Sequence, residues 1–356
     1  TIKKLVAKGA EIWVESGMGT PLGFTDGDFE AAGAKVVNDR VKTLGNADVV
    51  VRLRKPPIEE IPKLKKGALH ISYLDPFNER EIVDKFVACG TSVIAMEMIP
   101  RTTLAQKMDA LSSQANIAGY VAVLVAANKL NIVFPMMMTP AGTLKPAKVF
   151  VIGVGVAGLQ AIATAKRLGA RVSAFDTRPV VEEQVKSLGA KFVKIDLGET
   201  GQTKDGYAKE LTAEQMEKQK EAMAKVIADS DVVITTAQLF GRKAPVIVTD
   251  AMVKSMRPGS VIVDLAAESG GNVEGSKPGE DVVVNGVTIV GAENMPGQMA
   301  RHATEMYAAN LANLITHFWD KDAKAIKLNT DDEIMNGCLI IHGGEIRSEM
   351  IKKARS

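Results

Sequence analysis

The sequence predicts an α/β protein of two domains with mostly parallel sheets, separated by a cleft and joined by long helices. Apolar segments of strand length alternate with helical segments in two series, one before residue 100 and one from residue 148 onward. A glycine-rich turn opens the second series. The 356 residues suffice for two domains, because a domain usually has about 100–200 residues and its own core.

The first series predicts one domain. Strands are expected at 11–16, 47–54, 68–74 and 91–99, and helices at 2–8, 28–34, 58–67 and 78–90. This alternation indicates βα units, in which helices cover both faces of a parallel sheet. The chain opens on a helix, whereas such a domain usually opens on a strand, which suggests that a first strand is missing.

Residues 101–120, "RTTLAQKMDALSSQANIAGY", read as a single helix with an unusual polar stripe. Gln106, Asp109 and Ser112 are spaced three apart, so they share one side of a helix, and Arg101 stands just before them. Such a stripe is either a solvated face or a set of groups that hold a ligand. The apolar segment that follows predicts a long helical bridge to the second domain.

The second series starts after a Pro- and Gly-containing connector at 135–148. Strands are expected at 148–155, 171–176, 191–196, 231–237 and 260–266, a hairpin at 281–291, and helices at 156–170, 179–190, 213–230, 249–259 and 303–320. The polar stretch 198–212 predicts a mobile loop.

The end of the chain contains a short hairpin, 337–346, in a segment too small to be a domain. We expect it to pack back on the first domain. The predicted division is therefore a discontinuous first domain, residues 1–112 and 303–356, and a second domain, residues 113–302.

The strongest motif is "VFVIGVGVAGLQ", in which Gly153, Gly155 and Gly158 fit G-x-G-x-x-G between a strand and a helix. The first glycine permits a tight turn, the second lets backbone approach a pyrophosphate, and the third lets helix and strand pack closely. The helix N-terminus offers free N–H groups to phosphates. This context predicts a Rossmann-like fold; the alternative is a turn whose glycines serve packing alone.

Asp176 ends the next predicted strand, 23 residues after Gly153. A carboxylate there accepts both hydroxyls of an adenosine ribose and repels a 2′-phosphate, which favours NAD(H) over NADP(H). Arg178 argues in the other direction, because an arginine near this position can bind a 2′-phosphate. We give Asp176 the greater weight, since it occupies the ribose position itself.

Composition excludes several classes of function. The 44 Lys and Arg nearly balance the 42 Asp and Glu, and no basic block indicates a nucleic-acid partner. The two cysteines, Cys89 and Cys338, are far apart and the four histidines are isolated, so no metal site is expected. No uncharged apolar stretch reaches 18 residues, so we expect no transmembrane segment.

These motifs together resemble the alanine dehydrogenase/pyridine nucleotide transhydrogenase family, in particular the NAD(H)-binding component of proton-translocating transhydrogenases. The resemblance extends over nearly the whole chain, from "VAKGAEIWVESG" to about residue 345. It is carried by "RTTLAQKMDALSSQANIAGY", "GVGVAGLQAIATAKRLGA", "AFDTRP", "DGYAKEL", "TTA", "APVIVT" and "RPGSVIVDLAAESGGN".

The resemblance implies a role for each residue in these motifs. The catalytic set, which would hold the nicotinamide end of NAD(H), is Arg101, Gln106, Asp109, Ser112 and the loop residue Tyr207. The implied cofactor-binding residues are Gly153, Gly155, Val156, Ala157, Gly158, Asp176, Thr177, Arg178, Thr236, Ala237 and Glu268. Asp109 is expected to hold Arg101 in a bidentate pair, and Ser112 and Gln106 to orient the carboxamide.

The resemblance also implies partners and a location. NADP(H) would be bound on a separate partner domain, proton movement would belong to membrane subunits on other chains, and the protein would be a homodimer. The chain would be cytoplasmic and peripheral on the inner membrane, or on the matrix side in a mitochondrion.

Two other functions compete with this expectation. One is an alanine dehydrogenase-like amino-acid oxidoreductase. That activity is disfavoured because Asp75 stands where alanine dehydrogenases carry a histidine for the oxo acid, although Lys55 keeps the family lysine. The other is a non-catalytic NAD-binding module, which would have no need for the Arg101–Ser112 array.

Overall fold

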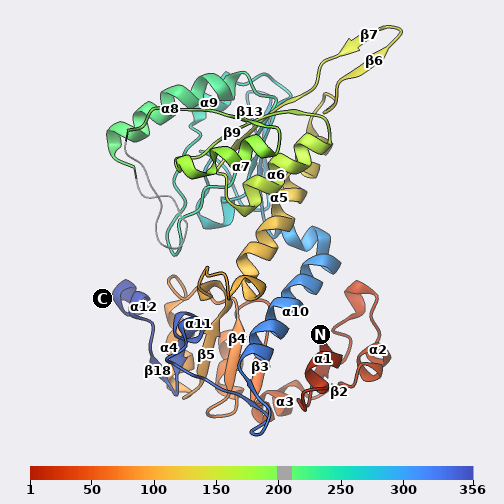
Figure 1. Cartoon of the computed structure of the whole chain (residues 1–356), viewed down its shortest axis with the longest axis vertical. Coiled ribbons are helices and arrows are strands. Elements are labelled where there is room, and N and C mark those ends of the chain that lie inside the picture. Colours follow the sequence, from red (N-terminus) through yellow and green to blue (C-terminus); the bar gives the residue numbers. More distant parts are fainter. Residues whose placement is uncertain (199–210, 356) are drawn as a thin grey trace. The chain divides into compact units, whose positions relative to one another are not determined.

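The computed structural model describes residues 1–198 and 211–355 and divides into two compact units (Figure 1). Unit 1 comprises Thr1–Ser113 and Ala300–Ser356, and unit 2 comprises Gln114–Met299. Both are α/β units, and most strand pairs of the two units taken together are parallel, as predicted from the alternation of strands and helices.

Unit 1 is built on a five-stranded sheet with the order β18-β17-β5-β4-β3. Its strands are β3 (Val49–Val51), β4 (Leu69–Ser72), β5 (Ser92–Ala95), β17 (Leu339–His342) and β18 (Glu345–Ile346). The first three are parallel, and β17 pairs antiparallel with β5. The expectation that the C-terminal hairpin packs back on the first domain is thus confirmed.

The first predicted strand does not join this sheet. It forms β1 (Trp13–Glu15), which pairs in parallel with β2 (Lys35–Val37) as a separate two-stranded sheet. A second small pair is antiparallel: β15 (Trp319–Asp320) with β16 (Ala325–Ile326).

Unit 1 contains seven α-helices in the described residues, and its strands β4 and β5 are buried along their whole length. The helices are α1 (Ile2–Val6), α2 (Asp26–Ala31), α3 (Arg40–Asn46), α4 (Arg80–Ala88), α10 (Ala300–His317), α11 (Glu333–Cys338) and α12 (Glu349–Arg355). Short 3₁₀ helices are η1 (Thr20–Leu22), η2 (Ile58–Lys63), η3 (Met96–Met98), η4 (Gln106–Met108) and η7 (Met295–Met299), the last in unit 2.

Unit 2 is built on a seven-stranded sheet with the order β10-β9-β8-β11-β12-β14-β13. Its strands are β8 (Lys148–Ile152), β9 (Arg171–Phe175), β10 (Lys191–Phe192), β11 (Val232–Thr235), β12 (Val261–Asp264), β13 (Asp281–Val284) and β14 (Val287–Gly291). The order reverses between β8 and β11, which is the topological switch point of a doubly wound sheet. The predicted hairpin is confirmed: β13 and β14 are antiparallel, joined by Asn285 and Gly286 at φ 50° and 76°.

Helices enclose this sheet in two apolar cores, one on each side. They are α5 (Ala110–Lys129), α6 (Val156–Arg167), α7 (Glu182–Ser187), α8 (Ala213–Ala228) and α9 (Asp250–Ser255), with the 3₁₀ turns η5 (Pro179–Val181) and η6 (Ala267–Ser269). α5 lies very close to α6, because a Cβ on Gly119 would be 2.1 Å from the carbonyl oxygen of Ala157. The glycine therefore permits this helix contact.

The helix predicted at 101–120 is wrong in its first half. Residues 101–109 form turns and the single turn η4, and the α-helix begins at Ala110. Its N-terminus is set by Asp109, which takes the capping position described below. The polar residues Gln106, Asp109 and Ser112 therefore do not lie on one helix face.

α5 bears on the expectation about membrane spans. In the described residues it is the one helix long and apolar enough to cross a membrane by length and composition, with a mean hydropathy of 1.4. Length and composition are weak evidence, because a core helix has both. Val121, Ala122, Val123 and Ala126 of α5 are at most 1 % exposed within one core of unit 2.

The predicted connector contains an additional hairpin. β6 (Met137–Thr139) and β7 (Gly142–Leu144) pair antiparallel, and every residue of both strands is exposed. Figure 1 shows this hairpin projecting from the body of unit 2.

Candidate functional site

The three glycines of the turn after β8 have distinct environments. Gly153 has φ 92°, and a Cβ there would lie 2.5 Å from Thr236 Oγ1. A Cβ on Gly158 would lie 2.0 Å from the carbonyl oxygen of Gly153. A Cβ on Gly155 meets no atom of the described residues within 4 Å. Gly153 and Gly158 are thus required for packing, and Gly155 leaves open space.

That open space adjoins the N-terminus of α6. Gly155 is the N-cap residue, and Val156 and Ala157 form the first turn, which contains no acidic side chain and, in the described part of the chain, receives no side-chain cap. The first N–H groups of a helix have no partner within it, and the helix dipole favours an anion there. The turn therefore fits a pyrophosphate.

Asp176 lies at the carboxyl end of β9 and faces the same turn. Its Oδ2 accepts a hydrogen bond from the backbone N–H of Val154 at 2.7 Å. Its carboxylate also accepts bonds from the Arg178 Nε and NH2 groups at 2.9 and 2.8 Å. The pair is nearly buried, with side chains 6 % and 14 % exposed, and the bond to Asp176 raises the pKa of Arg178. Arg178 is thus held by Asp176, with Thr177 between them in sequence.

The end of β11 is fastened to this turn across the switch point. The Thr236 hydroxyl donates to the carbonyl oxygen of Gly153 at 3.0 Å. The backbone N–H of Ala237 donates to Asn272 Oδ1 at 3.0 Å. Glu268 lies beyond β12, is exposed, and accepts a bond from the Asn294 N–H at 3.1 Å. Unit 2 therefore brings the predicted cofactor residues to the carboxyl ends of its strands, where doubly wound folds bind ligands.

Two residues of this region were missed from the sequence. Asp264 is fully buried and accepts bonds from the Thr235 hydroxyl and the Asn272 N–H, at 3.0 and 2.9 Å. Asn272, also fully buried, holds Ala237. The signal was present in "VIVDLAAESGGN", where a carboxylate ends a wholly apolar strand and an amide follows a glycine pair.

In unit 1 the Arg101–Ser112 segment follows β5, and Asp109 organises it. The Asp109 carboxylate accepts bonds from the Ser112 backbone N–H at 2.9 Å and from its hydroxyl at 2.6 Å. These are the bonds of an N-cap. Asp109 is therefore engaged with Ser112. Its expected bidentate pair with Arg101 stays a prediction. Gln106 and Arg101 are both exposed.

α10 holds the same segment from the other side. Asn310 and Asn313 each donate from Nδ2 to the carbonyl oxygen of Lys107, both at 3.0 Å. Asn310 Oδ1 also accepts from the Ser113 hydroxyl at 2.7 Å. The segment is therefore fixed through the Lys107 carbonyl and the Ser113 hydroxyl, and neither anchor uses the exposed side chains of Arg101 and Gln106.

Beneath this segment lies a buried polar cluster at the ends of β4 and β5. Glu97 Oε1 accepts the backbone N–H groups of Leu74 and Asp75, at 2.8 and 2.6 Å, and burial raises its pKa. Tyr73 stacks on Tyr307 with ring centroids 5.6 Å apart, and burial raises the pKa of both phenols. Among the residues described, Glu97 Oε2 and the Tyr73 hydroxyl have no hydrogen-bond partner.

His70 is buried beside this cluster. Its Nε2 lies 2.9 Å from the hydroxyl of Ser72, which itself donates to the Tyr73 carbonyl. The Ser72 oxygen is then an acceptor for Nε2–H, so Nε2 carries a proton. Burial lowers the pKa of His70 to about 3.

The positions linked to oxo-acid chemistry are both engaged within the chain. Lys55 forms an ion pair with Glu79. Asp75 has a left-handed backbone, φ 52°, and its carboxylate accepts a bond from Asn78 Nδ2 at 2.9 Å. Tyr207, predicted to act from the loop 198–212, lies outside the described residues.

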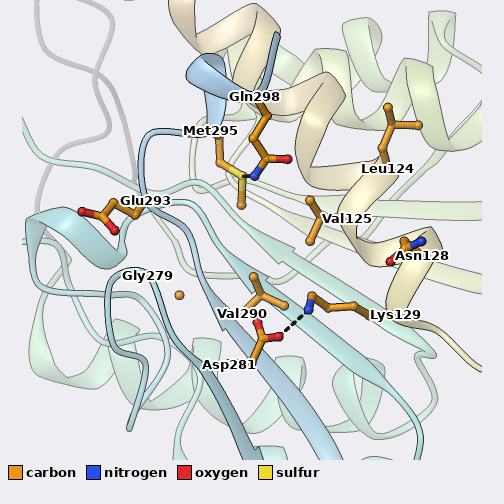
Figure 2. A pocket seen from close by; sticks show the side chains of 11 residues that line it. Leu124, Val125, Asn128, Lys129, Gly279, Asp281, Val290, Glu293, Met295 and Gln298 are labelled. Atoms are coloured by element: carbon orange, nitrogen blue, oxygen red, sulfur yellow. Dashed lines mark hydrogen bonds and ion pairs between the residues drawn. The ribbon is translucent and has the colours of Figure 1, made fainter. Parts of the chain in front are cut away.

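Unit 2 also contains a cavity of about 650 Å³ that none of the predicted site residues lines (Figure 2). It lies between the second half of α5 and the strands β13 and β14, and the ion pair Lys129–Asp281 crosses it. The remaining lining residues are Leu124, Val125, Asn128, Gly279, Val290, Gly291, Glu293, Met295 and Gln298. We place the candidate site at the glycine turn, because a phosphate needs the free N–H groups found there.

Comparison with known proteins agrees with this assignment. Residues 1–118 match the family model "Alanine dehydrogenase/PNT, N-terminal domain", and residues 122–349 match its C-terminal counterpart. An NAD(P) transhydrogenase alpha-subunit protein of Rhodospirillum rubrum is 45% identical over 352 residues, which are 97% of this chain and 92% of that protein. An alanine dehydrogenase of Halomonas elongata is 29% identical over 359 residues, 99% of this chain and 90% of that protein.

A solved structure of transhydrogenase from Sinorhizobium meliloti superimposes with a TM-score of 0.86 at 44% sequence identity, covering 97% of this chain and 93% of that one. The resemblance stated from the motifs is therefore confirmed over both units. The chain belongs to the alanine dehydrogenase/pyridine nucleotide transhydrogenase family.

Proposed function

We propose that this chain is the NAD(H)-binding component of a proton-translocating transhydrogenase, an oxidoreductase in which hydride passes directly between NADH and NADP⁺ held on a partner domain. The observation that carries the proposal is the turn at Gly155. It combines open space, a helix N-terminus without an acidic residue, and a carboxylate at the end of the neighbouring strand. This combination fits a dinucleotide.

The adenosine half would be held by unit 2, within the nucleotide-binding domain that we assign to residues 113–302. The N–H groups of Val156 and Ala157 would receive the pyrophosphate, and Asp176 the ribose hydroxyls. Thr177 and Arg178 would flank the ribose, and Thr236, Ala237 and Glu268 would line the crevice beyond the switch point. Since Asp176 already holds Arg178, the guanidinium is restrained from a 2′-phosphate, which favours NAD(H).

NAD(H) supplies the hydride itself, so the protein needs no acid or base at the reacting carbon. We assign Arg101, Gln106 and Ser112 to orienting the nicotinamide carboxamide, with Asp109 fixing Ser112 and Tyr207 acting from its loop. The Asp109–Ser112 bond presets the hydroxyl in one position. Correct placement can account for a large part of a rate enhancement.

Alanine dehydrogenase activity is the second candidate, supported by the family and by Lys55. The ion pair between Lys55 and Glu79 argues against it. An oxo-acid carboxylate would have to compete with Glu79 for the Lys55 ammonium group, and Asp75 would repel that carboxylate.

The proposed partners are an NADP(H)-binding domain and membrane subunits that carry the proton, so the chain would be peripheral to a membrane. A homodimer is also proposed, because the β6–β7 hairpin leaves Met136, Met137 and Met138 exposed by 60%, 45% and 79%. A two-stranded hairpin is marginal alone in water. A second copy of this chain would cover these side chains.

The direct test is to mix this chain with the NADP(H)-binding domain of a transhydrogenase and follow hydride exchange between the two nucleotides. We expect exchange that requires both proteins. Binding of NADH without any exchange would rule out the transhydrogenase assignment and leave a nucleotide-binding module.

A further inference from the structure

Asp264 and Asn272 form a buried hydrogen-bond network at the carboxyl ends of β11 and β12. Register places Thr235 of β11 opposite Asp264 of β12, at the carboxyl ends of both strands. Asp264 is fully buried, and it accepts bonds from the Thr235 hydroxyl and from the N–H groups of Ala266 and Asn272, at 3.0, 3.0 and 2.9 Å. A carboxylate with this many donors is fixed in position.

Asn272 connects the fixed carboxylate of Asp264 to Ala237, which lies at the rim of the crevice. Its Oδ1 accepts the Ala237 N–H at 3.0 Å, and its Nδ2 donates to the Ala237 carbonyl at 2.8 Å. Nδ2 also donates to the Pro245 carbonyl at 2.8 Å. One side chain thus bonds both backbone groups of Ala237, as a neighbouring strand would, in a place where no strand continues.

The position of Ala237 decides which half of a dinucleotide it serves. A doubly wound sheet consists of two mononucleotide-binding halves that meet at the switch point. The half with the glycine turn and Asp176 serves the adenosine side, so the half formed by β11, β12 and β14 serves the nicotinamide side. Ala237 lies in the segment that leaves β11 on that side, two positions after the last strand residue, Thr235.

We propose that Asn272 is a positioning residue for the nicotinamide half of the dinucleotide, acting by holding the backbone of Ala237 and itself anchored by Asp264. The inference rests on the proposed placement of NAD(H) at the glycine turn. Without the amide, Ala237 loses both partners, and the rim loses the conformation that receives the nicotinamide ribose. The adenosine half should be affected much less, because the first N–H groups of α6 and Asp176 are proposed to hold it.

The experiment compares the binding of NADH with the binding of 5′-AMP, which reports the adenosine half alone. Asn272→Ala is expected to weaken NADH about tenfold, the effect of about one hydrogen bond, and to leave 5′-AMP within about twofold. If the alanine variant folds poorly, Asn272→Ser replaces it as the smaller perturbation. The same result is expected, because serine also lacks the amide. Amide exchange of Ala237 in the nucleotide-free protein should accelerate in both variants.

Ser230→Ala is the matched control. Ser230 is also buried, but its hydroxyl bonds to the Val226 carbonyl at the opposite end of β11. It should leave NADH, 5′-AMP and the exchange of Ala237 unchanged. Equal losses of NADH and 5′-AMP in the Asn272 variants, or no loss of either, would overturn the inference. Asp176→Ala tests the proposed nucleotide site separately. If NADH and 5′-AMP bind at the glycine turn, this change weakens both of them. If it weakens neither, the proposed site itself is wrong.

Discussion

The two candidate regions differ in how their polar groups are satisfied. At the switch point of unit 2, Asp176, Asp264 and Asn272 each make several hydrogen bonds. At the strand ends of unit 1, Glu97 Oε2 and the Tyr73 hydroxyl are buried with no partner among the described residues. Fully bonded networks make a rigid socket, whereas unsatisfied buried groups usually mark strain or function.

This difference suggests that the two units have different roles in binding and reaction. Under the proposed function, unit 2 would bind the adenosine and pyrophosphate half of the dinucleotide, by means of backbone N–H groups and fixed carboxylates. Unit 1 presents exposed side chains on a short segment anchored by its backbone, which suits the adjustment of one reacting ring. Affinity should therefore depend on unit 2, and reaction rate on unit 1.

The largest expected effect is at Gly158. Gly158→Ala should abolish NADH binding and lower the free energy of unfolding by about 1–3 kcal/mol, because the added methyl meets backbone at 2.0 Å. Gly155→Ala should also impair NADH binding but keep stability, since its methyl enters open space. Nucleotide titration and chemical denaturation of both variants check this, and equal stability of the two would contradict the roles assigned to the glycines.

The next effect concerns the rate. Gln106→Asn, Asp109→Asn and Ser112→Ala should each slow hydride transfer to a partner-bound NADP⁺ by about 10²-fold, with little change in NADH affinity. Arg101→Ala should affect both quantities. Stopped-flow transfer rates beside equilibrium titrations measure the split. Lys107→Ala, exposed on the same segment, is the control, and rates unchanged in all four variants would refute the assignment.

A somewhat smaller effect is expected at Asp176. Asp176→Ala should weaken NADH by about 1.5–3 kcal/mol, the value of a hydrogen bond to a charged group. It should also release Arg178 and so reduce the discrimination against NADPH. Titration of both nucleotides measures this, and tighter NADPH than NADH binding by the unchanged protein would disprove the predicted preference.

His70 offers a test of the unsatisfied cluster. Its pKa is about 3 when buried and about 6.5 when unfolded, so between these values the unfolded chain binds a proton that the folded chain does not. Stability should therefore fall as pH decreases through this window, by about 2 kcal/mol from pH 7 to pH 5. Urea unfolding at both pH values should show a smaller fall for His70→Gln. An identical fall would mean that His70 does not titrate as described.

The last prediction is that the protein alone has no alanine dehydrogenase activity. The protein alone should not oxidise NADH with pyruvate and ammonium, because Lys55 is paired with Glu79 and Asp75 would repel the oxo acid. Absorbance at the NADH band follows the reaction, with an alanine dehydrogenase as positive control. Measurable turnover would restore the second candidate function.

Much of unit 2 could be predicted from the sequence, since the middle of its central strands is apolar and its turn combines glycines and a carboxylate in a local motif. Unit 1 was harder to predict. The helix expected at 101–120 failed because spacing alone cannot show that Asp109 ends the preceding turn and caps the next helix. The ion pair Lys55–Glu79 and the Asn272–Ala237 bonds join residues 24 and 35 positions apart, and only tertiary structure brings such groups together.

The hairpin of β6 and β7 has a chemical consequence. Its three consecutive methionines place their thioethers in water, where oxidants convert methionine to the sulfoxide, a polar and reversible product. Met138 is 79% exposed and would react early. A sulfoxide no longer suits an apolar contact, so a second copy seated on the hairpin would both shield these sulfur atoms and be loosened by their oxidation. In the proposed homodimer, the strength of this contact would therefore depend on how far these methionines had been oxidised.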